Sequence, residues 1–284
     1  MTTLVEVWTA LRRRFEAAGI ETPVIDARLL LEAGAGVSRL DIITDPRRAI
    51  SAEQAAAVER LAQRREAREP VSQIIGRKGF WTFELSVTAD VLTPRPDTEL
   101  VVDTALEMLT GERPSKVLDL GVGSGAILLA ILHERPLARG VAVDASAAAL
   151  RVAQTNAKAL GLDTRIDWIG GSWDSECGEG FDIVVSNPPY IPSEEIAGLE
   201  PEVARFEPHL ALDGGEDGLD AYRMITPALP RLLRPGGGFV LEVGKGQAPA
   251  VAALAEAAGL SGVHARRDLA GVERVVAGRA AGSG

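Results

Sequence analysis

The sequence predicts an α/β protein, with a doubly wound, mostly parallel, seven-stranded sheet that follows a small N-terminal bundle of helices. Short apolar runs typical of buried strands alternate with longer runs of helical spacing from about residue 93 onward. A glycine-rich turn joins one of these strands to the next helix. Residues 1–72 show helical spacing alone, so we expect a helical domain there, a strand or hairpin linker at 73–92 and the α/β domain at 93–284.

The N-terminal region is expected to form three helices, at Leu4–Ala18, Val24–Ala33 and Ala52–Arg68, with Ser51 as the N-cap of the third. Leucine, valine and phenylalanine side chains recur at helical spacing and predict a small core. The arginine-rich segments of this region are more typical of solvated helix faces than of binding sites. The region therefore shows little catalytic character.

The segment that joins the two domains alternates apolar and polar residues at Gly79–Val87, which predicts a strand or hairpin. Two prolines then stiffen the entry to a helix at Asp97–Leu109. Arg95 and Glu99 lie at the start of this helix. Helix-start electrostatics and a role near a ligand are both open for these two residues.

A strand, a glycine turn and a helix follow. Lys116–Leu120 is typical of a buried strand and Ala126–Glu134 of a helix, and the turn between them consists of Gly121, Val122, Gly123, Ser124 and Gly125. Glycines let the backbone approach a ligand closely, and the helix N-terminus offers N–H groups to a carboxylate or phosphate. About 20 residues later the strand Gly140–Val143 ends at Asp144, where an acidic side chain can accept ribose hydroxyls. Together these features predict a nucleoside-binding crevice.

The next helix is expected at Ala147–Leu160 and the next strand at Arg165–Ile169. Trp173 follows that strand at its carboxyl end, which is the edge of an open α/β sheet where ligands bind. Its indole can pack against an adenine ring, or it can be a rim aromatic that covers the core. Its position at the strand end is compatible with both interpretations.

An unusual corner follows the apolar strand Phe181–Val185. It consists of Asn187, Pro188, Pro189 and Tyr190. The two prolines have no N–H, so the Asn187 side-chain oxygen and the Pro188 carbonyl oxygen can each accept an N–H from a planar amide-like NH2 group, while the Tyr190 ring lies against the flat group. The tetrapeptide alone favours this interpretation and a simple proline-rich turn about equally.

The remaining elements complete the sheet. Helices are expected at Gly218–Leu233 and Gln247–Ala258, and strands at Phe239–Val243, Val263–Arg267 and Glu273–Ala277.

Composition limits the function classes. The formal charge of −10 and the lack of a long basic stripe disfavour tight binding to nucleic acid. No apolar run is long enough to cross a bilayer and no signal-peptide pattern is visible, so we expect a cytoplasmic protein without membrane contact. His133, His209 and His264 are scattered, and the single cysteine is Cys177, so no metal site is predicted.

The order of these motifs resembles the class I S-adenosylmethionine-dependent methyltransferases that act on planar nitrogens. More narrowly, the chain resembles the peptide chain release factor glutamine methyltransferases. The resemblance runs from about Pro70 to Val276, and its motifs are Phe80-Trp81, the segment Thr93–Glu99, Asn187–Ile191, Arg205–Pro208 and Gly214–Gly218. Several spaced motifs in order are more specific than any one of them.

The resemblance implies a Rossmann-like fold whose last strand is antiparallel. It also implies an enzyme that transfers a methyl group from S-adenosyl-L-methionine, leaving S-adenosyl-L-homocysteine, to the glutamine amide in the Gly-Gly-Gln motif of bacterial release factors 1 and 2. Asn187, Pro188 and Tyr190 are then the expected catalytic residues, and Pro189 joins them in substrate binding. The expected cofactor residues are Asn187, Asp144, Trp173 and the turn at residues 121–125.

Two alternatives stay open. An adenine-N6 or cytosine-N4 nucleic-acid methyltransferase also acts on a planar NH2 group, although the acidic charge disfavours it. A non-catalytic nucleoside-binding adaptor with the same fold is the other alternative. Val122 departs from the family, where threonine or cysteine is usual, and this should cost at most one hydrogen bond, on the order of 1 kcal/mol. We hypothesise that the N-terminal bundle helps to recognise a protein substrate.

Overall fold

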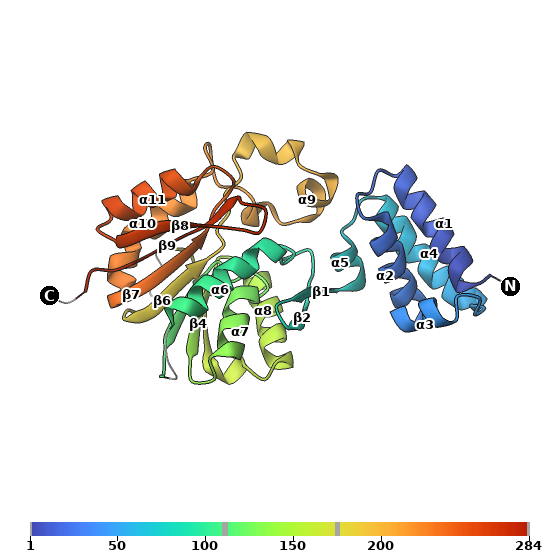
Figure 1. Ribbon diagram of the computed structural model, residues 1–284, viewed down its shortest axis with the longest axis horizontal. Coiled ribbons are helices and arrows are strands. Elements are labelled where there is room, and N and C mark those ends of the chain that lie inside the picture. Colours follow the sequence, from blue (N-terminus) through green and yellow to red (C-terminus); the bar gives the residue numbers. More distant parts are fainter. Residues whose placement is uncertain (1, 110–112, 174–176, 283–284) are drawn as a thin grey trace. The chain divides into compact units, whose positions relative to one another are not determined.

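The computed structural model describes residues 2–109, 113–173 and 177–282. The chain divides into two compact units (Figure 1). One unit consists of residues 1–77 together with 200–206, and the other consists of residues 78–199 and 207–284. The chain therefore passes between the units at residues 77–78, 199–200 and 206–207.

The first unit is a bundle of helices. Serine and threonine start several of them, and Ser38 and Ser51 each form a capping box that satisfies the first backbone N–H groups. Leucine and alanine side chains that recur at helical spacing form its core. Its elements are α1 (Leu4–Ala17), α2 (Pro23–Ala35), α3 (Arg39–Thr44), α4 (Ala52–Glu66), α5 (Val71–Ile75) and α9 (Pro201–Phe206).

The second unit contains a two-stranded hairpin and a seven-stranded sheet in the order β5-β4-β3-β6-β7-β9-β8. Strands β3 to β7 pair in parallel, and β9 is antiparallel to both β7 and β8. The strands are β1 (Arg77–Phe80), β2 (Phe83–Ser86), β3 (Lys116–Leu120), β4 (Arg139–Asp144), β5 (Ile166–Gly170), β6 (Phe181–Ser186), β7 (Leu233–Glu242), β8 (Ser261–Arg267) and β9 (Glu273–Arg279).

Helices cover both faces of this sheet (Figure 1). Alternate residues of the strands point to opposite faces, so Ile183 and Val185 pack with α6, α7 and α8, whereas Val184 packs with α10 and α11. The helical elements are α6 (Glu99–Met108), α7 (Ala126–Glu134), α8 (Ala147–Ala159), α10 (Asp220–Leu232) and α11 (Ala248–Ala257), with short 3-10 turns η1 (Pro96–Thr98), η2 (Asp163–Arg165), η3 (Ser193–Gly198) and η4 (His209–Ala211).

The predicted fold class is confirmed, including the antiparallel last strand. The sequence did not predict the short helices α3, α5 and α9, because each is too short for a helical repeat to stand out. Strand β7 starts six residues earlier than expected: the segment Pro235–Gly238, which resembles a turn, lies within the strand next to an irregularity in its pairing with β6. No helix in the described ranges is long and apolar enough to span a membrane.

Candidate active site

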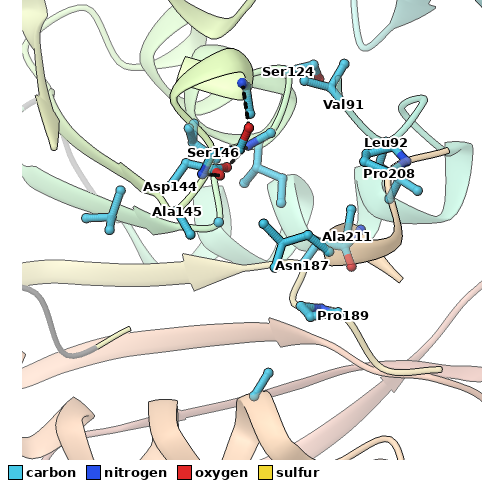
Figure 2. A pocket seen from close by; sticks show the side chains of 18 of the residues that line it. Val91, Leu92, Ser124, Asp144, Ala145, Ser146, Asn187, Pro189, Pro208 and Ala211 are labelled. Carbon is cyan, nitrogen blue, oxygen red and sulfur yellow. Dashed lines mark hydrogen bonds between the residues drawn. The ribbon is translucent and has the colours of Figure 1, made fainter. Parts of the chain in front are cut away.

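A pocket of about 420 Å³ lies at the carboxyl ends of β3, β4 and β6, where the turns after these strands supply much of its lining. This is the edge at which parallel α/β sheets bind ligands, because the loops there diverge to opposite faces of the sheet. Figure 2 shows Asp144 and Ser146 on one wall of the pocket, and Asn187 and Pro189 on another. The carboxyl-end positions predicted from the sequence therefore meet around one cavity.

The glycine turn after β3 forms one wall. Gly121 has a φ of +76°, and a Cβ atom there would lie 3.1 Å from the Trp173 ring, so only glycine fits at this position without displacing the indole. Gly125 starts α7 with a φ of +88°, and a Cβ atom there would lie 2.8 Å from a Leu129 methyl group. Gly121 thus makes room for the Trp173 ring beside the pocket. Gly125 leaves room for the Leu129 side chain at the start of α7.

Asp144 links the turn to the next helix. One carboxylate oxygen accepts the Gly123 N–H at 2.8 Å, and the other accepts the Ser146 N–H at 2.8 Å. Each oxygen keeps a lone pair for a further donor, because a carboxylate can accept about four hydrogen bonds. Asp144 is therefore fixed in place while it still has capacity to accept ligand hydroxyls.

The corner after β6 presents acceptor oxygens. The Asn187 Nδ2 group donates to the Thr98 hydroxyl at 3.3 Å, which leaves Oδ1 as the free end of this amide. Within the described residues, neither Asn187 Oδ1 nor the Pro188 carbonyl oxygen accepts a hydrogen bond. Ser186 closes the strand just before the corner, and its buried hydroxyl donates to the Leu120 carbonyl at 2.6 Å. The corner is thus anchored from behind and has two acceptors available.

Tyr190 is held at the back of this corner. Its carbonyl oxygen accepts the Gln247 Nε2 group at 2.9 Å, while Gln247 Oε1 accepts the Gly244 N–H at 3.0 Å. Burial raises the pKa of the Tyr190 hydroxyl, so this group is neutral across the physiological pH range. Tyr190 can therefore donate a hydrogen bond or offer its ring, but it cannot serve as an ionised base.

An ion pair between Arg95 and Glu207 supports a further wall, to which Arg95 contributes. Arg95 donates through one terminal nitrogen to both Glu207 oxygens at 2.9 Å, and Glu207 is buried. Burial raises the pKa of Glu207, while the Arg95 charge and the Thr93 hydrogen bonds act against this rise. Glu99, by contrast, accepts the Trp81 backbone N–H at 2.9 Å and so holds the hairpin turn. The sequence left the same two roles open for Arg95 and Glu99, and the structure gives them different ones. Arg95 lines the pocket, whereas Glu99 supports the hairpin.

Two more carboxyl groups are buried near the carboxyl ends of β3 and β7. Neither Asp119 oxygen has a hydrogen-bond partner among the described residues, and burial raises its pKa to about 7 against the pull of the Leu128 N–H at the start of α7. Glu242 Oε2 also lacks a partner, and burial raises the pKa of Glu242 to about 7, even though Thr98 and Arg274 favour its ionised form. Sequence reasoning missed both residues, although a lone acid inside an apolar strand was a visible signal.

Most of the predicted site residues line the pocket. They are Gly121, Val122, Gly123, Ser124, Asp144, Trp173, Asn187 and Pro189. Gly125, Pro188 and Tyr190 are not among the lining residues, and lie directly beside residues that are. The sequence did not predict the wall made by Pro208, Leu210 and Ala211, which come from a long connection after the corner. The roles assigned to all these residues stay predictions.

The residues present fit a nucleoside with an amino-acid tail. Asp144 has capacity for ribose hydroxyls, Trp173 offers a flat apolar surface, and the turn at residues 121–125 brings backbone to the cavity. The pocket also has more apolar than polar lining, as expected for a site that encloses adenine.

Comparison with known proteins agrees with this geometry. The family model of the PrmC N-terminal domain matches residues 6–76, and that of the methyltransferase small domain matches residues 98–199. The release factor glutamine methyltransferase of Caulobacter vibrioides is 54% identical over 97% of this chain and 96% of its own length. That of Rhodospirillum rubrum is 48% identical over 95% of this chain and 83% of its own length. A methyltransferase structure from Pyrococcus furiosus matches with a TM-score of 0.51 and 15% identity, over 69% of this chain and 88% of that one, and shows the fold alone.

The fold and the pocket define an S-adenosylmethionine-dependent methyltransferase of class I, with S-adenosylmethionine as its methyl donor. The two release factor glutamine methyltransferases compared above align with nearly the whole chain, so the similarity covers both units. The chain belongs to the release factor glutamine methyltransferase family.

Proposed function

We propose that this protein methylates the side-chain amide nitrogen of the glutamine in the Gly-Gly-Gln motif of bacterial peptide chain release factors 1 and 2. The observation that carries the proposal is the pair of free acceptor oxygens at the corner after β6, on Asn187 and Pro188. Two acceptors match the two N–H groups of a primary amide. The names of relatives that align with nearly the whole chain support this class of substrate. The proposal includes a cytoplasmic location for the reaction.

The corner addresses the main chemical difficulty. An amide nitrogen is a poor nucleophile because its lone pair is delocalised, so it must be held in line with the methyl carbon at roughly 3 Å. S-adenosylmethionine, when bound, supplies an electrophilic sulfonium methyl group. The amide nitrogen gains positive charge as its bond to the methyl carbon forms and the carbon–sulfur bond breaks, so the Asn187 and Pro188 oxygens stabilise the transition state more than the ground state. The nitrogen then loses one N–H proton to water, which leaves a neutral methylated amide.

The other site residues have supporting roles in this proposal. Asp144 accepts the ribose hydroxyls, Trp173 packs against adenine, and the turn formed by Gly121, Val122, Gly123, Ser124 and Gly125 lies against the amino-acid part of the cofactor. Asn187 lies between cofactor and substrate. Pro189 and Tyr190 shape the substrate side, where a ring beside the corner keeps the amide flat.

A labelling experiment tests the proposal. Methyl transfer from labelled S-adenosylmethionine is measured with a purified release factor, with the same factor carrying Gln→Ala in its Gly-Gly-Gln motif, and with duplex DNA. Label on the unaltered factor alone is the expected result. Label on DNA would replace the proposal with a nucleic-acid methyltransferase, and cofactor binding without label on any acceptor would favour the non-catalytic adaptor.

A further inference from the structure

Gln247 lies between β7 and α11, and its side-chain amide binds backbone groups of three segments. The Nε2 group donates to the Tyr190 carbonyl at 2.9 Å and to the Gly218 carbonyl at 3.3 Å. The Oε1 atom accepts the Gly244 N–H at 3.0 Å. A primary amide has two N–H donors, and here each of them has an acceptor. The side chain therefore joins the corner after β6, the loop before α10 and the loop after β7.

The Gln247 side chain does not serve its own helix. Gln247 is the N-cap residue of α11, yet its side chain forms no capping hydrogen bond there. A side-chain oxygen at an N-cap position usually accepts an N–H of the first helical turn. The Gln247 oxygen instead accepts the N–H of Gly244, which precedes the helix. A substitution of this side chain therefore removes contacts to the three loops and no cap of α11.

Two glycines leave the space that this arrangement needs. A Cβ atom at Gly218 would lie 2.4 Å from the Tyr190 carbonyl oxygen and 2.6 Å from Gln247 Nε2. A Cβ atom at Gly244 would lie 2.7 Å from Gln247 Oε1 and 3.1 Å from the Tyr190 ring. Because these atoms are in close contact, a displacement of the amide displaces the Tyr190 carbonyl and ring as well.

The corner after β6 can be held at few points. Pro188 and Pro189 have no N–H, so neither can donate a backbone hydrogen bond that would fix the corner. The Pro188 carbonyl oxygen is one of the two acceptors that the proposed function assigns to the substrate. The Ser186 hydroxyl holds the strand before the corner, and Gln247 holds the Tyr190 carbonyl at its other end. The position of the Pro188 oxygen thus depends on both anchors.

We propose that Gln247 is a positioning residue, which fixes the corner after β6 and with it the Pro188 carbonyl oxygen for methyl transfer. This inference rests on the proposed function, because it takes the Pro188 oxygen as the acceptor of a substrate N–H. Gln247 is not among the lining residues of the pocket, so it acts through Tyr190 and does not touch the reacting atoms. A misplacement of about 1 Å at a reacting centre can cost about a hundredfold in rate.

The first test is Gln247→Met, since methionine is also unbranched and of similar length but donates no hydrogen bond. The kcat should fall by about tenfold or more, while the Kd for S-adenosylmethionine stays within about twofold. Lys245→Met places the same side chain at an exposed position of the same loop and should keep kcat within about twofold. Parent-like kcat in Gln247→Met would overturn the inference, and so would a loss of cofactor affinity as large as the loss of kcat.

The second test reaches the same contact from another segment and also serves if Gln247→Met does not fold. Gly218 and Gly259 have φ values of +75° and +82°, so alanine meets similar backbone strain at both positions. The new methyl group would press on the Tyr190 carbonyl at Gly218, whereas nothing lies within 4 Å at Gly259. Gly218→Ala should therefore lower kcat by about tenfold or more relative to Gly259→Ala. Equal kcat values in the two variants would overturn the inference.

A measurement without turnover keeps the two proposals distinguishable. The chain has two tyrosines, so a protein with isotope-labelled tyrosine gives ring signals from Tyr190 and Tyr222 alone. The Tyr190 signals should shift in Gln247→Met, whereas those of Tyr222, whose hydroxyl donates to the Glu242 carbonyl at 2.8 Å, should not. A shift of both rings would indicate a general loss of packing and would overturn the inference.

The two proposals can then fail separately. If the parent labels no release factor but the Tyr190 signals alone shift in Gln247→Met, the proposed substrate fails and Gln247 still fixes the corner. If the parent labels the factor but the Tyr190 signals of Gln247→Met match those of the parent, the positioning role fails and the substrate stands.

Discussion

In the N-terminal unit the buried side chains of Arg65 and Asp26 are paired with one another, whereas in the methyltransferase unit two buried carboxyl groups have oxygens without a hydrogen-bond partner among the described residues. Arg65 and Asp26 have side chains that are 5% and 3% exposed and lie 2.7 Å apart, and Arg65 also reaches Glu202 of α9 at 2.8 Å. Arg68 binds the same Glu202 carboxylate at 2.6 Å. These charges compensate one another without any ligand, as expected of a cluster whose task is structural.

The methyltransferase unit contains several oxygen atoms that accept no hydrogen bond from the described residues. Asp119 and Glu242 each have a buried oxygen without a partner among the described residues, and the corner oxygens of Asn187 and Pro188 accept nothing. Such groups cost stability in the free protein. The difference teaches that the buried charges around Glu202, which pair with one another, hold α9 in place, whereas the buried carboxyl oxygens without a partner belong to the unit that contains the pocket.

The largest expected effect comes from breaking the paired cluster. Arg65→Met should lower the free energy of unfolding of the N-terminal unit by about 3–5 kcal/mol, because it leaves Asp26 buried without its cation. Amide hydrogen exchange in α1, α2 and α4 of the full chain measures this unit by itself. As a control, Arg48→Met removes an exposed pair with Asp41 and should cost less than about 1 kcal/mol. Equal losses in the two variants would show that the buried cluster is no more than a surface contact.

Asn187→Ala should have the next largest effect, this time on catalysis. Removing an acceptor that acts in the transition state should reduce methyl transfer by a factor on the order of a hundred or more, with binding of S-adenosylmethionine retained. Single-turnover transfer and cofactor titration measure the two quantities separately. Thr155→Ala, on an exposed position of α8, serves as the unchanged control. Near-normal transfer by Asn187→Ala would remove this residue from the mechanism.

The sequence predicted the parts of the site that follow from strand ends. The turn at residues 121–125, Asp144 and Asn187 each follow an apolar strand, and parallel strands bring their carboxyl ends to one edge. Local spacing was therefore sufficient to group them. The boundaries of β3 and the start of α7 were also predicted to the residue, and α7 ends near the predicted position, because each has a sharp change from apolar run to glycine or charge.

The missed parts depend on contacts between distant segments. Glu207 pairs with Arg95, more than a hundred positions away in the chain, and no local pattern indicates such a partner. Likewise Glu202 lies on α9, yet its cations are Arg65 on α4 and Arg68 in the turn after α4. Tertiary packing decides these pairings, and it cannot be read from periodicity in a single sequence.

A substitution of Asp144 should have a smaller effect, on cofactor affinity. Each oxygen of this carboxylate already accepts one backbone N–H, so only part of its hydrogen-bonding capacity is free for a ligand. Asp144→Asn keeps one acceptor oxygen but loses the negative charge that Gly123 and Ser146 contact and that we propose binds ribose hydroxyls, so S-adenosylmethionine should bind about tenfold more weakly. Turnover at saturating cofactor should change little, because the proposed site of methyl transfer is the corner after β6. Calorimetric titration measures the affinity. Unchanged affinity would mean that the backbone N–H groups use the whole capacity of this carboxylate.

Asp119→Asn should have the smallest effect of these variants at acidic pH. Its effect is on the free energy of unfolding, and it should change with pH. Burial raises the pKa of Asp119 from an ordinary 3.8 to about 7, so the folded protein holds this proton more tightly than the unfolded chain. The stability that this protonation contributes is complete below pH about 4 and is lost as the pH rises through about 7. Asparagine does not titrate, so the variant should lose less stability than the parent over that range. Urea unfolding of both proteins at several pH values, without cofactor, measures the difference.

Asp167→Asn, on an exposed position of β5, controls for the removal of any negative charge from this unit. A difference between Asp119→Asn and the parent that does not change with pH would show that the buried carboxyl is compensated after all, and the contrast between the two units would then rest on Glu242 alone.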